Sequence, residues 1–200
     1  MNPIINDKYI DELPDEYKKS YLDYQTGTMN TETWGSHQPV LIHLVNTITE
    51  GDIIELGMGD NSTPILHLLC EKMGRKLFSY DFDSSWLNKF KSYENDNHKI
   101  LLLHENLFQR NLYDFPNKCS IAFIDSHPPW TRHHALSTLR DYADYFIFHD
   151  SFWNENNTIS RLNLYDFSYF KNVLHFTKVK NGTTICSNKE IPEEVTKIFK

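Results

Sequence analysis

The feature that most constrains this chain is an apolar run that passes through a glycine turn into a helix start, over residues 52–64 (DIIELGMGDNSTP). The apolar residues before the turn are typical of a parallel strand that is covered on both faces. Gly57 and Gly59 allow positive φ and let a ligand approach the bare main chain. Thr63 is suited to cap the helix and Pro64 to its first turn, so the free N–H groups of the helix would face the turn. The segment predicts a site for a nucleotide-type cofactor.

The glycine spacing and one acid separate two classes of cofactor. A dinucleotide site would use Gly-x-Gly-x-x-Gly, but Ser62 stands in place of the third glycine and loosens the helix–strand packing. Glu55, two residues before the first glycine, would repel a diphosphate and attract an ammonium group. The positions of Glu55, Gly57 and Gly59 resemble the first motif of class I S-adenosylmethionine (SAM) dependent methyltransferases, which implies SAM as cofactor. A glycine turn after any α/β strand is the alternative interpretation.

A second acid follows where a nucleoside cofactor needs one. Asp81 ends the next short strand pattern, 24 residues after Gly57, where one carboxylate can accept from both ribose hydroxyls. Asp83 is the competing ribose ligand, or the cap of the helix that follows it. Asn106, after the third predicted strand, is expected to contact the adenine. Ribose recognition alone also suits NAD, so the choice of SAM depends on Glu55 and Ser62.

Composition bounds the remaining alternatives. A chain of 200 residues with 40% apolar content can bury one core, and we expect a single domain. The net charge of −7 makes nucleic acid a poor partner. Three widely spaced cysteines (Cys70, Cys119 and Cys186) fit reduced thiols and form no zinc or disulfide pattern. Without a signal-peptide pattern or an apolar run of about 18 residues, we expect a soluble, cytoplasmic protein, in the host cytoplasm if it is viral.

Hydrophobic periodicity predicts an alternation of strands and helices. Asn181-Gly182, between two strand patterns, is the strongest hairpin signal. The predicted fold is α/β, a doubly wound Rossmann-like sheet that is mostly parallel and ends in an antiparallel hairpin, which resembles the class I methyltransferase sheet. We expect a core over 37–187, an N-terminal helix and lid over 1–36, and a tail over 188–200. Predicted strands are 52–56, 76–81, 99–103, 119–125, 143–149, 172–179 and 183–187, and helices are 37–49, 63–73, 85–92 and 131–140.

Ligands of such sheets bind at the carboxyl ends of the strands, where two acids stand. Asp125 ends the fourth predicted strand and Asp150 follows the fifth. Two carboxylates facing one cleft suit a divalent cation such as Mg²⁺ or Mn²⁺, or a shared acid–base role. The alternative is that one or both cap the segment that follows.

The residues after Asp125 resemble two families of methyltransferase. His127-Pro-Pro-Trp130 is similar to the Asp-Pro-Pro-aromatic motif of adenine amino-methyltransferases, but a histidine cannot reproduce the carboxylate or amide acceptor. The fuller pattern, Ile-Asp-x-His-Pro with a later His-Asp, resembles sugar and small-molecule O-methyltransferases, including glycan-modifying methyltransferase domains of large DNA viruses. That resemblance implies Asp125 and Asp150 as metal ligands and His127 as base, with the histidine spacing differing by about one residue.

Other candidate site residues surround these positions. His149 would act in catalysis or orient the substrate, and Arg132 would clamp the acceptor or be an ordinary helix arginine. Trp34 and His37 belong to a segment expected to cover the cofactor edge, although Ser36 could instead cap a helix with a hydrophobic staple. Trp153 would line the acceptor pocket or simply cover the sheet.

The sequence thus predicts a SAM-dependent O-methyltransferase that acts on a hydroxyl of a sugar or glycan, such as a deoxyhexose like rhamnose, or of another small polyhydroxyl acceptor. A divalent metal, Mg or Mn, would assist the reaction. Two alternatives stay open: an adenine or nucleic-acid N-methyltransferase, and a non-catalytic subunit that binds SAM or a nucleotide. The expected partner is a small molecule or glycan, with no nucleic acid and no membrane.

Overall fold

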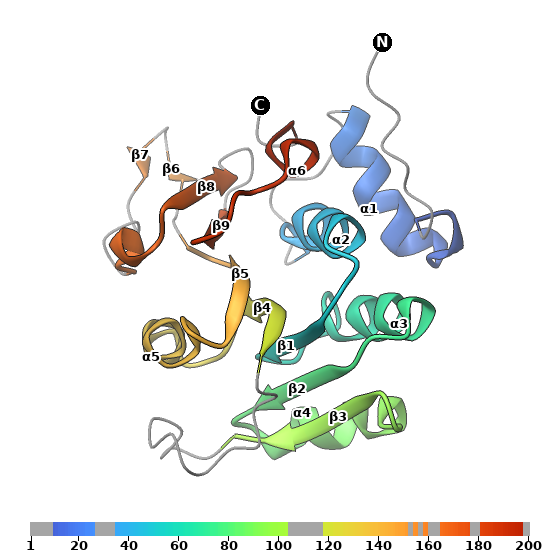
Figure 1. The fold of residues 1–200 in the computed structure, drawn as a ribbon. Coiled ribbons are helices and arrows are strands. Elements are labelled where there is room, and N and C mark those ends of the chain that lie inside the picture. Colours follow the sequence, from blue (N-terminus) through green and yellow to red (C-terminus); the bar gives the residue numbers. More distant parts are fainter. Residues whose placement is uncertain are drawn as a thin grey trace.

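The computed structural model describes residues 10–26, 35–103, 118–151, 154–155, 158–159, 165–176 and 181–197. Within them, seven strands form one sheet in the order β3-β2-β1-β4-β5-β9-β8 (Figure 1). The first five strands pair in parallel, and the C-terminal pair adds antiparallel to β5. The strands are β1 (Asp52–Leu56), β2 (Leu77–Asp81), β3 (His98–Leu102), β4 (Cys119–Ile124), β5 (Ala143–Phe148), β8 (Asn172–Phe176) and β9 (Thr183–Ser187).

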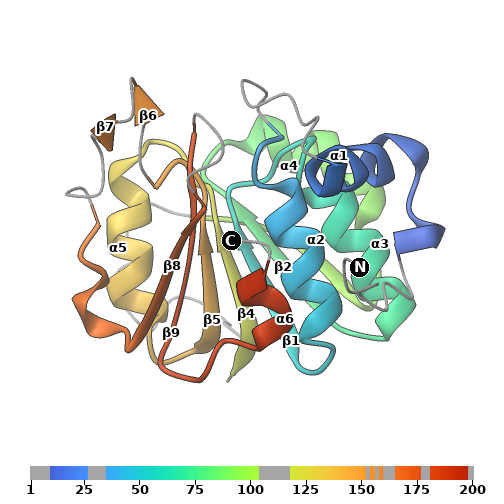
Figure 2. The ribbon, with the colours of Figure 1, turned by 90° about the horizontal axis from the view of Figure 1, so that it is seen from above.

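Helices cover both faces of the sheet. Helices α2, α3 and α6 lie on one face with α1 outside them, and α5 lies on the other (Figure 2). The predicted doubly wound sheet with a closing hairpin is confirmed. The helices are α1 (Asp15–Thr26), α2 (Gln38–Thr47), α3 (Thr63–Met73), α4 (Ser84–Phe90), α5 (Trp130–Leu139) and α6 (Glu193–Lys197), with short 3₁₀ turns at Ile10–Glu12, Lys91–Tyr93 and Phe167–Tyr169.

Side chains that alternate along the central strands form two separate cores. Ile53 and Ile121 point to the α2 and α3 side, while their neighbours Ile54 and Ala122 point to the α5 side. All four are fully buried. Central parallel strands must be apolar on both faces, which explains the continuous apolar runs in the sequence.

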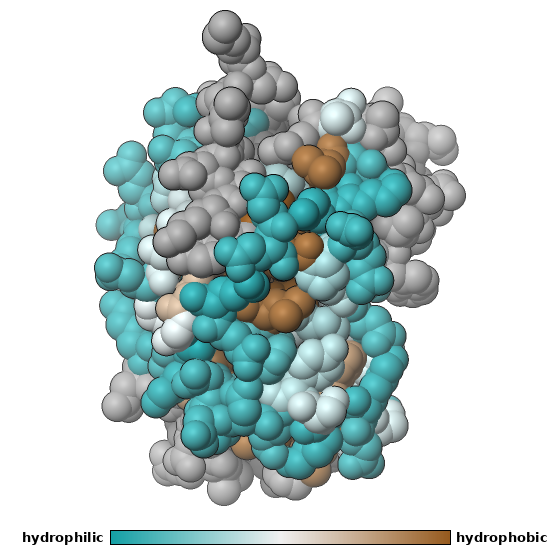
Figure 3. Space-filling view, turned by 90° about the vertical axis from the view of Figure 1, so that its right-hand side faces the viewer, coloured by the Kyte–Doolittle hydropathy of each residue, from teal (hydrophilic) through white to brown (hydrophobic). Residues whose placement is uncertain are grey.

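The surface over α1 and α3 is mostly hydrophilic, with a small hydrophobic patch near its centre (Figure 3). Leu22 of α1 is among the few large apolar side chains that are exposed in the described part of the chain. None of the helices within that part is long and apolar enough to cross a membrane.

Most predicted boundaries agree with the structure to within one or two residues. The sequence did not predict the small hairpin of β6 (Asn154–Glu155) and β7 (Thr158–Ile159), α6 in the segment expected to be a tail, or the short 3₁₀ turns. Cys70, Cys119 and Cys186 are buried and unpaired with one another, as expected for reduced core thiols.

Candidate active site

A cavity of about 540 Å³ opens at the carboxyl ends of the central strands, where the sequence places its candidate residues. Its volume lies within the range of small-molecule and cofactor sites. One end meets the turn after β1, and the other meets the ends of β4 and β5. Its lining comprises His37, Gly57, Met58, Gly59, Asp60, Asn61, Ser62, Asp81, Asp83, Trp86, Asp125, His127, Arg132, His149 and Asp150.

The two glycines of the turn have different roles. Gly57 has a φ of +94°, and a Cβ there would lie 2.5 Å from the carbonyl of Asp125. Gly57 is therefore required for packing against the end of β4. A Cβ on Gly59 would meet only the Ser62 hydroxyl, at 3.7 Å. Gly59 is the glycine that leaves open space at the cavity wall.

Glu55 lies inside the turn instead of facing a ligand. Its side chain is fully buried, and its oxygens accept hydrogen bonds from Ser62 Oγ (2.7 Å), Thr63 Oγ1 (3.0 Å) and Ser79 Oγ (2.5 Å). Burial raises the pKa of Glu55 to about 7, although the three hydroxyl donors oppose the rise. We expected Glu55 to attract an ammonium group directly. The structure instead gives it the role of holding the turn and the helix start together.

The helix start is organised differently from the prediction. Ser62, not Thr63, occupies the N-cap position of α3, and its side chain makes no capping hydrogen bond. Both hydroxyls donate to the buried Glu55, and the Thr63 oxygen accepts from the backbone N–H of Gly59 at 3.0 Å. The backbone N–H groups of Ser62 and Thr63 both donate to the carbonyl oxygen of Gly59, and Pro64 has no N–H, so the turn itself satisfies the first N–H groups of this helix end.

Ser79 and His98, which sequence reasoning missed, extend the support of Glu55. Because the Ser79 hydroxyl donates to Glu55, it accepts from His98 Nε2 at 2.9 Å. His98 Nδ1 then accepts from His67 Nδ1, at 3.0 Å. Burial lowers the pKa of both histidines, and that of His98 falls to about 4. The pattern of apolar and polar residues in β2 does not indicate this network, because a serine at position 79 is an ordinary small residue of a strand.

Asp81 stands where a ribose ligand was predicted. Its Oδ2 accepts from the backbone N–H of Met58 at 2.8 Å, and its Oδ1 accepts from that of Asp83 at 2.9 Å. A carboxylate offers about four acceptor positions, so acceptor capacity is left for a ribose hydroxyl. Asp83 accepts from the N–H of Ser85 and is the N-cap of α4, which was its alternative interpretation. Trp86 of α4, not singled out in the sequence, adds an aromatic wall.

The half-buried Asp125 and the buried His149 form a pair at the other end. Asp125 Oδ2 lies 3.0 Å from His149 Nδ1. Burial opposes the charged form of His149, but the carboxylates of Asp125 and Asp150 outweigh it and raise the pKa of His149. Burial likewise opposes the charge on Asp125, and His149 and Arg132 outweigh it and lower its pKa. The Ser36 hydroxyl donates to Asn181 O at 3.1 Å, so it accepts from His149 Nε2 at 3.2 Å.

Arg132 takes the place expected for a cation between the two acids. Its Nη2 lies 2.8 Å from Asp125 Oδ1, and its Nη1 lies 3.2 Å from Asp150 Oδ2. The guanidinium also donates to the backbone carbonyls of Ser126 (2.9 Å) and His149 (2.8 Å). The predicted Mg²⁺ or Mn²⁺ site held jointly by Asp125 and Asp150 does not fit this arrangement, because the guanidinium of Arg132 lies between the two carboxylates and pairs with one oxygen of each. Arg132 is thus a structural clamp of the strand ends.

The remaining candidates divide into those that reach the cavity and those that the described residues do not include. His37 is almost fully buried and lines the cavity. The centroid of its ring lies 4.3 Å from that of His149. His127 is exposed and lines the cavity at its rim. Trp34, Asn106 and Trp153 lie outside the described residues, so their predicted roles stay predictions.

The residues present fit SAM. Main-chain groups of the glycine turn, the acceptor capacity of Asp81 and the ring of Trp86 line one end of the cavity, as a nucleoside with an amino-acid tail needs.

Comparison with solved structures agrees with this geometry. The SAH-bound methyltransferase PaMTH1 from Podospora anserina matches with a TM-score of 0.57 at 12% identity, over 95% of this chain and 97% of that one. The O-methyltransferase TomG from Streptomyces achromogenes, solved with SAM, matches with a TM-score of 0.56 at 11% identity, over 90% and 94%. The N-terminal domain of human METTL16 with SAH matches with a TM-score of 0.51 at 10% identity, over 92% and 98%.

These similarities establish the fold. The chain has the fold of the class I SAM-dependent methyltransferases, as its sequence resemblance implied. No known family pattern and no curated protein matches the sequence itself.

Proposed function

We propose that this protein is a SAM-dependent O-methyltransferase that acts on a hydroxyl of a sugar, a glycan or another small polyhydroxyl molecule. The observation that carries the proposal is that one cavity joins the glycine turn and Asp81 to His127 and Asp150. A cofactor above the turn and an acceptor at the ends of β4 and β5 would therefore share a single space. The similarity to structures solved with SAM or SAH supports the same cofactor.

The side chains at the acceptor end suit the removal of a hydroxyl proton. SAM, when bound, supplies a methyl group that its sulfonium centre already activates. The protein then has to align the acceptor and take its proton. His127 is exposed at the cavity rim, and a neutral imidazole accepts a proton near neutral pH. Asp150 Oδ1 is buried without a hydrogen-bond partner among the described residues, with His149 Nε2 at 3.5 Å, so it has a lone pair with which to accept from a neighbouring hydroxyl of the same molecule.

The charge of the cavity favours a neutral acceptor. Its lining holds five aspartates, and Arg132, which is already paired, is its only arginine or lysine among the described residues. Such a wall repels a polyanion and offers acceptors to hydroxyl groups. Trp130, next to this rim, is 53% exposed and offers a flat apolar face for the C–H side of a sugar ring.

Methylation of an adenine amine is the second candidate. The Pro128-Pro129-Trp130 segment follows β4, at the position where adenine amino-methyltransferases carry their motif. We rank this candidate below the first for two reasons. His127 stands where those enzymes have an acid or an amide, and the cavity is acidic. A non-catalytic subunit that only binds SAM is the third.

Two measurements test the proposal. Calorimetric titration should show binding of S-adenosylhomocysteine and none of NAD, and the reverse result would refute the cofactor. Labelled SAM is then offered with methyl glycosides, oligosaccharides, DNA and RNA oligomers. We expect label on glycan oxygen, and label on adenine alone would establish the second candidate. His127→Gln should lower transfer by about 100-fold or more with unchanged cofactor affinity, while the exposed His133→Gln should not.

A further inference from the structure

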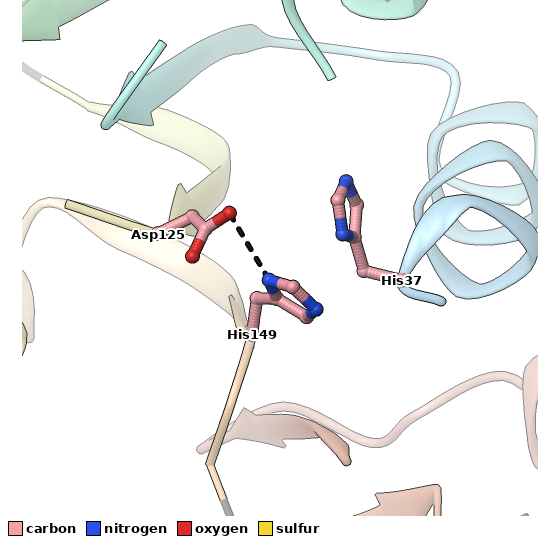
Figure 4. Close-up of side chains that lie close together, drawn as sticks. All are labelled: His37, Asp125 and His149. Atoms are coloured by element: carbon pink, nitrogen blue, oxygen red, sulfur yellow. Dashed lines mark hydrogen bonds and ion pairs between the residues drawn. The ribbon is translucent and has the colours of Figure 1, made fainter. Parts of the chain in front are cut away.

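We propose that His37, Asp125 and His149 form a binding site for one divalent transition-metal ion. The three side chains come from the start of α2 and from the ends of β4 and β5, and they point toward one another (Figure 4). One ligand atom from each lies within 4.8 Å of the other two. This site differs from the one predicted from sequence, because its ligands are two imidazoles and one carboxylate instead of two carboxylates. It is proposed independently of methyl transfer.

The first observation is a free lone pair on a buried histidine. His37 Nε2 lies 3.3 Å from the carbonyl oxygen of Asn61, which can only accept, so the ring proton is on Nε2. Nδ1 is then an unprotonated acceptor, and it has no partner among the described residues. The side chain is 2% exposed. A buried acceptor without a partner is costly, and a metal ion at Nδ1 would remove that cost.

The second observation is the spacing of the other two ligand atoms. His149 Nδ1 lies 3.0 Å from Asp125 Oδ2. Two ligands that each lie at about 2.0 Å from a tetrahedral zinc ion are about 3.3 Å apart. The pair therefore accommodates an ion with a shift of a few tenths of an ångström, and the ion would replace the proton that the pair shares.

The third observation is that the opposite atom of each proposed ligand is held by another group. His37 Nε2 donates to Asn61 O, and His149 Nε2 donates to the Ser36 hydroxyl. Asp125 Oδ1 is paired with Arg132 at 2.8 Å. Metal-binding histidines almost always donate their second N–H to such a partner, and metal-binding carboxylates are likewise hydrogen bonded. Arg132 thus orients Asp125, while Asp150 balances the arginine charge.

The ligand set indicates the kind of ion. Imidazole nitrogens suit zinc, iron, cobalt, nickel and copper, whereas Mg²⁺ and Ca²⁺ prefer oxygen ligands. Two histidines and one carboxylate also leave coordination positions open toward the cavity that all three residues line. We therefore assign the site to an ion of the zinc and cobalt type, and not to Mg²⁺.

The test is metal binding by the full chain. Protein stripped with EDTA is dialysed and titrated with Zn²⁺ and with Co²⁺ in a calorimeter, and Co²⁺ spectra are recorded. We expect one equivalent of each ion, intense visible bands for Co²⁺, and no displacement by millimolar Mg²⁺. His37→Phe keeps a ring against Phe123 and removes the nitrogen, and it should weaken Co²⁺ binding by at least about 100-fold. His133→Phe, on the exposed side of α5, is the matched control and should bind as the unmodified protein does.

Either of two results would overturn the assignment. One is that unmodified protein binds no more Zn²⁺ or Co²⁺ than the chelator-treated blank. The other is that Asp150→Asn abolishes binding while His37→Phe and His149→Phe do not. If a variant fails to unfold cooperatively, the Co²⁺ bands of the unmodified protein decide the question alone. S-adenosylhomocysteine affinity is measured on the same samples, so failure of the metal site and failure of the proposed function are told apart.

Discussion

The α-carbon of Gly57 packs against the peptide bond between Asp125 and Ser126, so closely that any Cβ at position 57 would lie 2.5 Å from the Asp125 carbonyl. The turn after β1 and the end of β4 therefore form one unit. The turn after β1 forms the cofactor end of the cavity, and the end of β4 forms the acceptor end. A change at Gly57 must disturb both ends at once.

Gly57→Ala is expected to destabilise the fold by more than about 2 kcal/mol, because the positive φ costs about 1–2 kcal/mol and the clash adds to it. Urea unfolding measures the loss. Gly74→Ala is the matched control, since Gly74 has a φ of +65° with nothing within 4 Å of its Cβ. It should cost only about 1 kcal/mol. Equal losses in the two variants would show that packing against Asp125 is unimportant.

Gly59→Ala should leave stability nearly unchanged and weaken cofactor binding. Gly59 does not have a positive φ, and its Cβ would have only the Ser62 hydroxyl nearby, at 3.7 Å. That Cβ would occupy space at the cavity wall, and we expect S-adenosylhomocysteine affinity to fall about tenfold, or roughly 1.4 kcal/mol. Calorimetric titration checks the affinity. Full affinity in this variant would place the cofactor away from the turn.

Asp81→Asn should weaken S-adenosylhomocysteine binding by about 1–3 kcal/mol, since an amide retains only part of the acceptor capacity of the carboxylate. Asp83→Asn is the comparison, because Asp83 caps α4 and asparagine caps equally well. It should change neither affinity nor stability by much. A larger loss of affinity at Asp83 than at Asp81 would reverse the assignment of the ribose ligand.

Arg132→Met should destabilise the protein by about 3–5 kcal/mol, because it leaves the carboxylates of Asp125 and Asp150 without their cation. Arg132→Lys restores the charge but not the fork geometry, so it should recover only part of the loss. Arg140→Met, at the exposed end of α5, should change stability by less than about 1 kcal/mol. Urea unfolding at neutral pH separates the three, and a neutral effect of Arg132→Met would contradict the clamp.

Glu55 should make stability fall as the pH rises toward neutral. Its pKa is about 7 when folded and 4.5 in the unfolded reference, so the unfolded chain loses this proton first. Ionisation of Glu55 does not change the free energy of unfolding below pH 4.5. Above pH 7 it lowers the free energy of unfolding by about 3 kcal/mol. Glu55→Gln cannot titrate, so its stability relative to the unmodified protein should increase between pH 5 and 8. Glu71→Gln, on an exposed side chain, is the control, and parallel curves for Glu55→Gln would contradict the shift.

The architecture was predictable because it depends on local signals. Continuous apolar runs define the central strands, and Asn181-Gly182 lies between the two strands of the closing hairpin. The end of the cavity near Asp81 was predictable for the same reason, since the spacing from Gly57 follows from one strand–helix–strand unit. The hairpin of β6 and β7 was missed because two-residue strands carry no period.

The polar contacts were not predictable, because they depend on which side chains meet across the fold. Glu55 had the right position for a ligand contact, yet hydroxyls from α3 and β2 surround it. The sequence was equally compatible with Arg132 as an ordinary helix arginine. Only tertiary packing brings it between Asp125 and Asp150. A sequence shows that acids end two strands, but it does not show which cation lies between them.

The hydroxyl of Ser36 contacts His149, 113 positions later, and Asn181, 145 positions later. During folding, such distant partners meet only after the long intervening loops have closed. The parallel strands β1 to β5 can pair before then. The hydrogen bonds that hold the His149 side chain are complete only when the turn before β9 packs against Ser36. The acceptor end of the cavity, around His149, is thus among the last parts of the molecule to form. A folding probe at Ser36 should report a later event than one in the β1–β4 core.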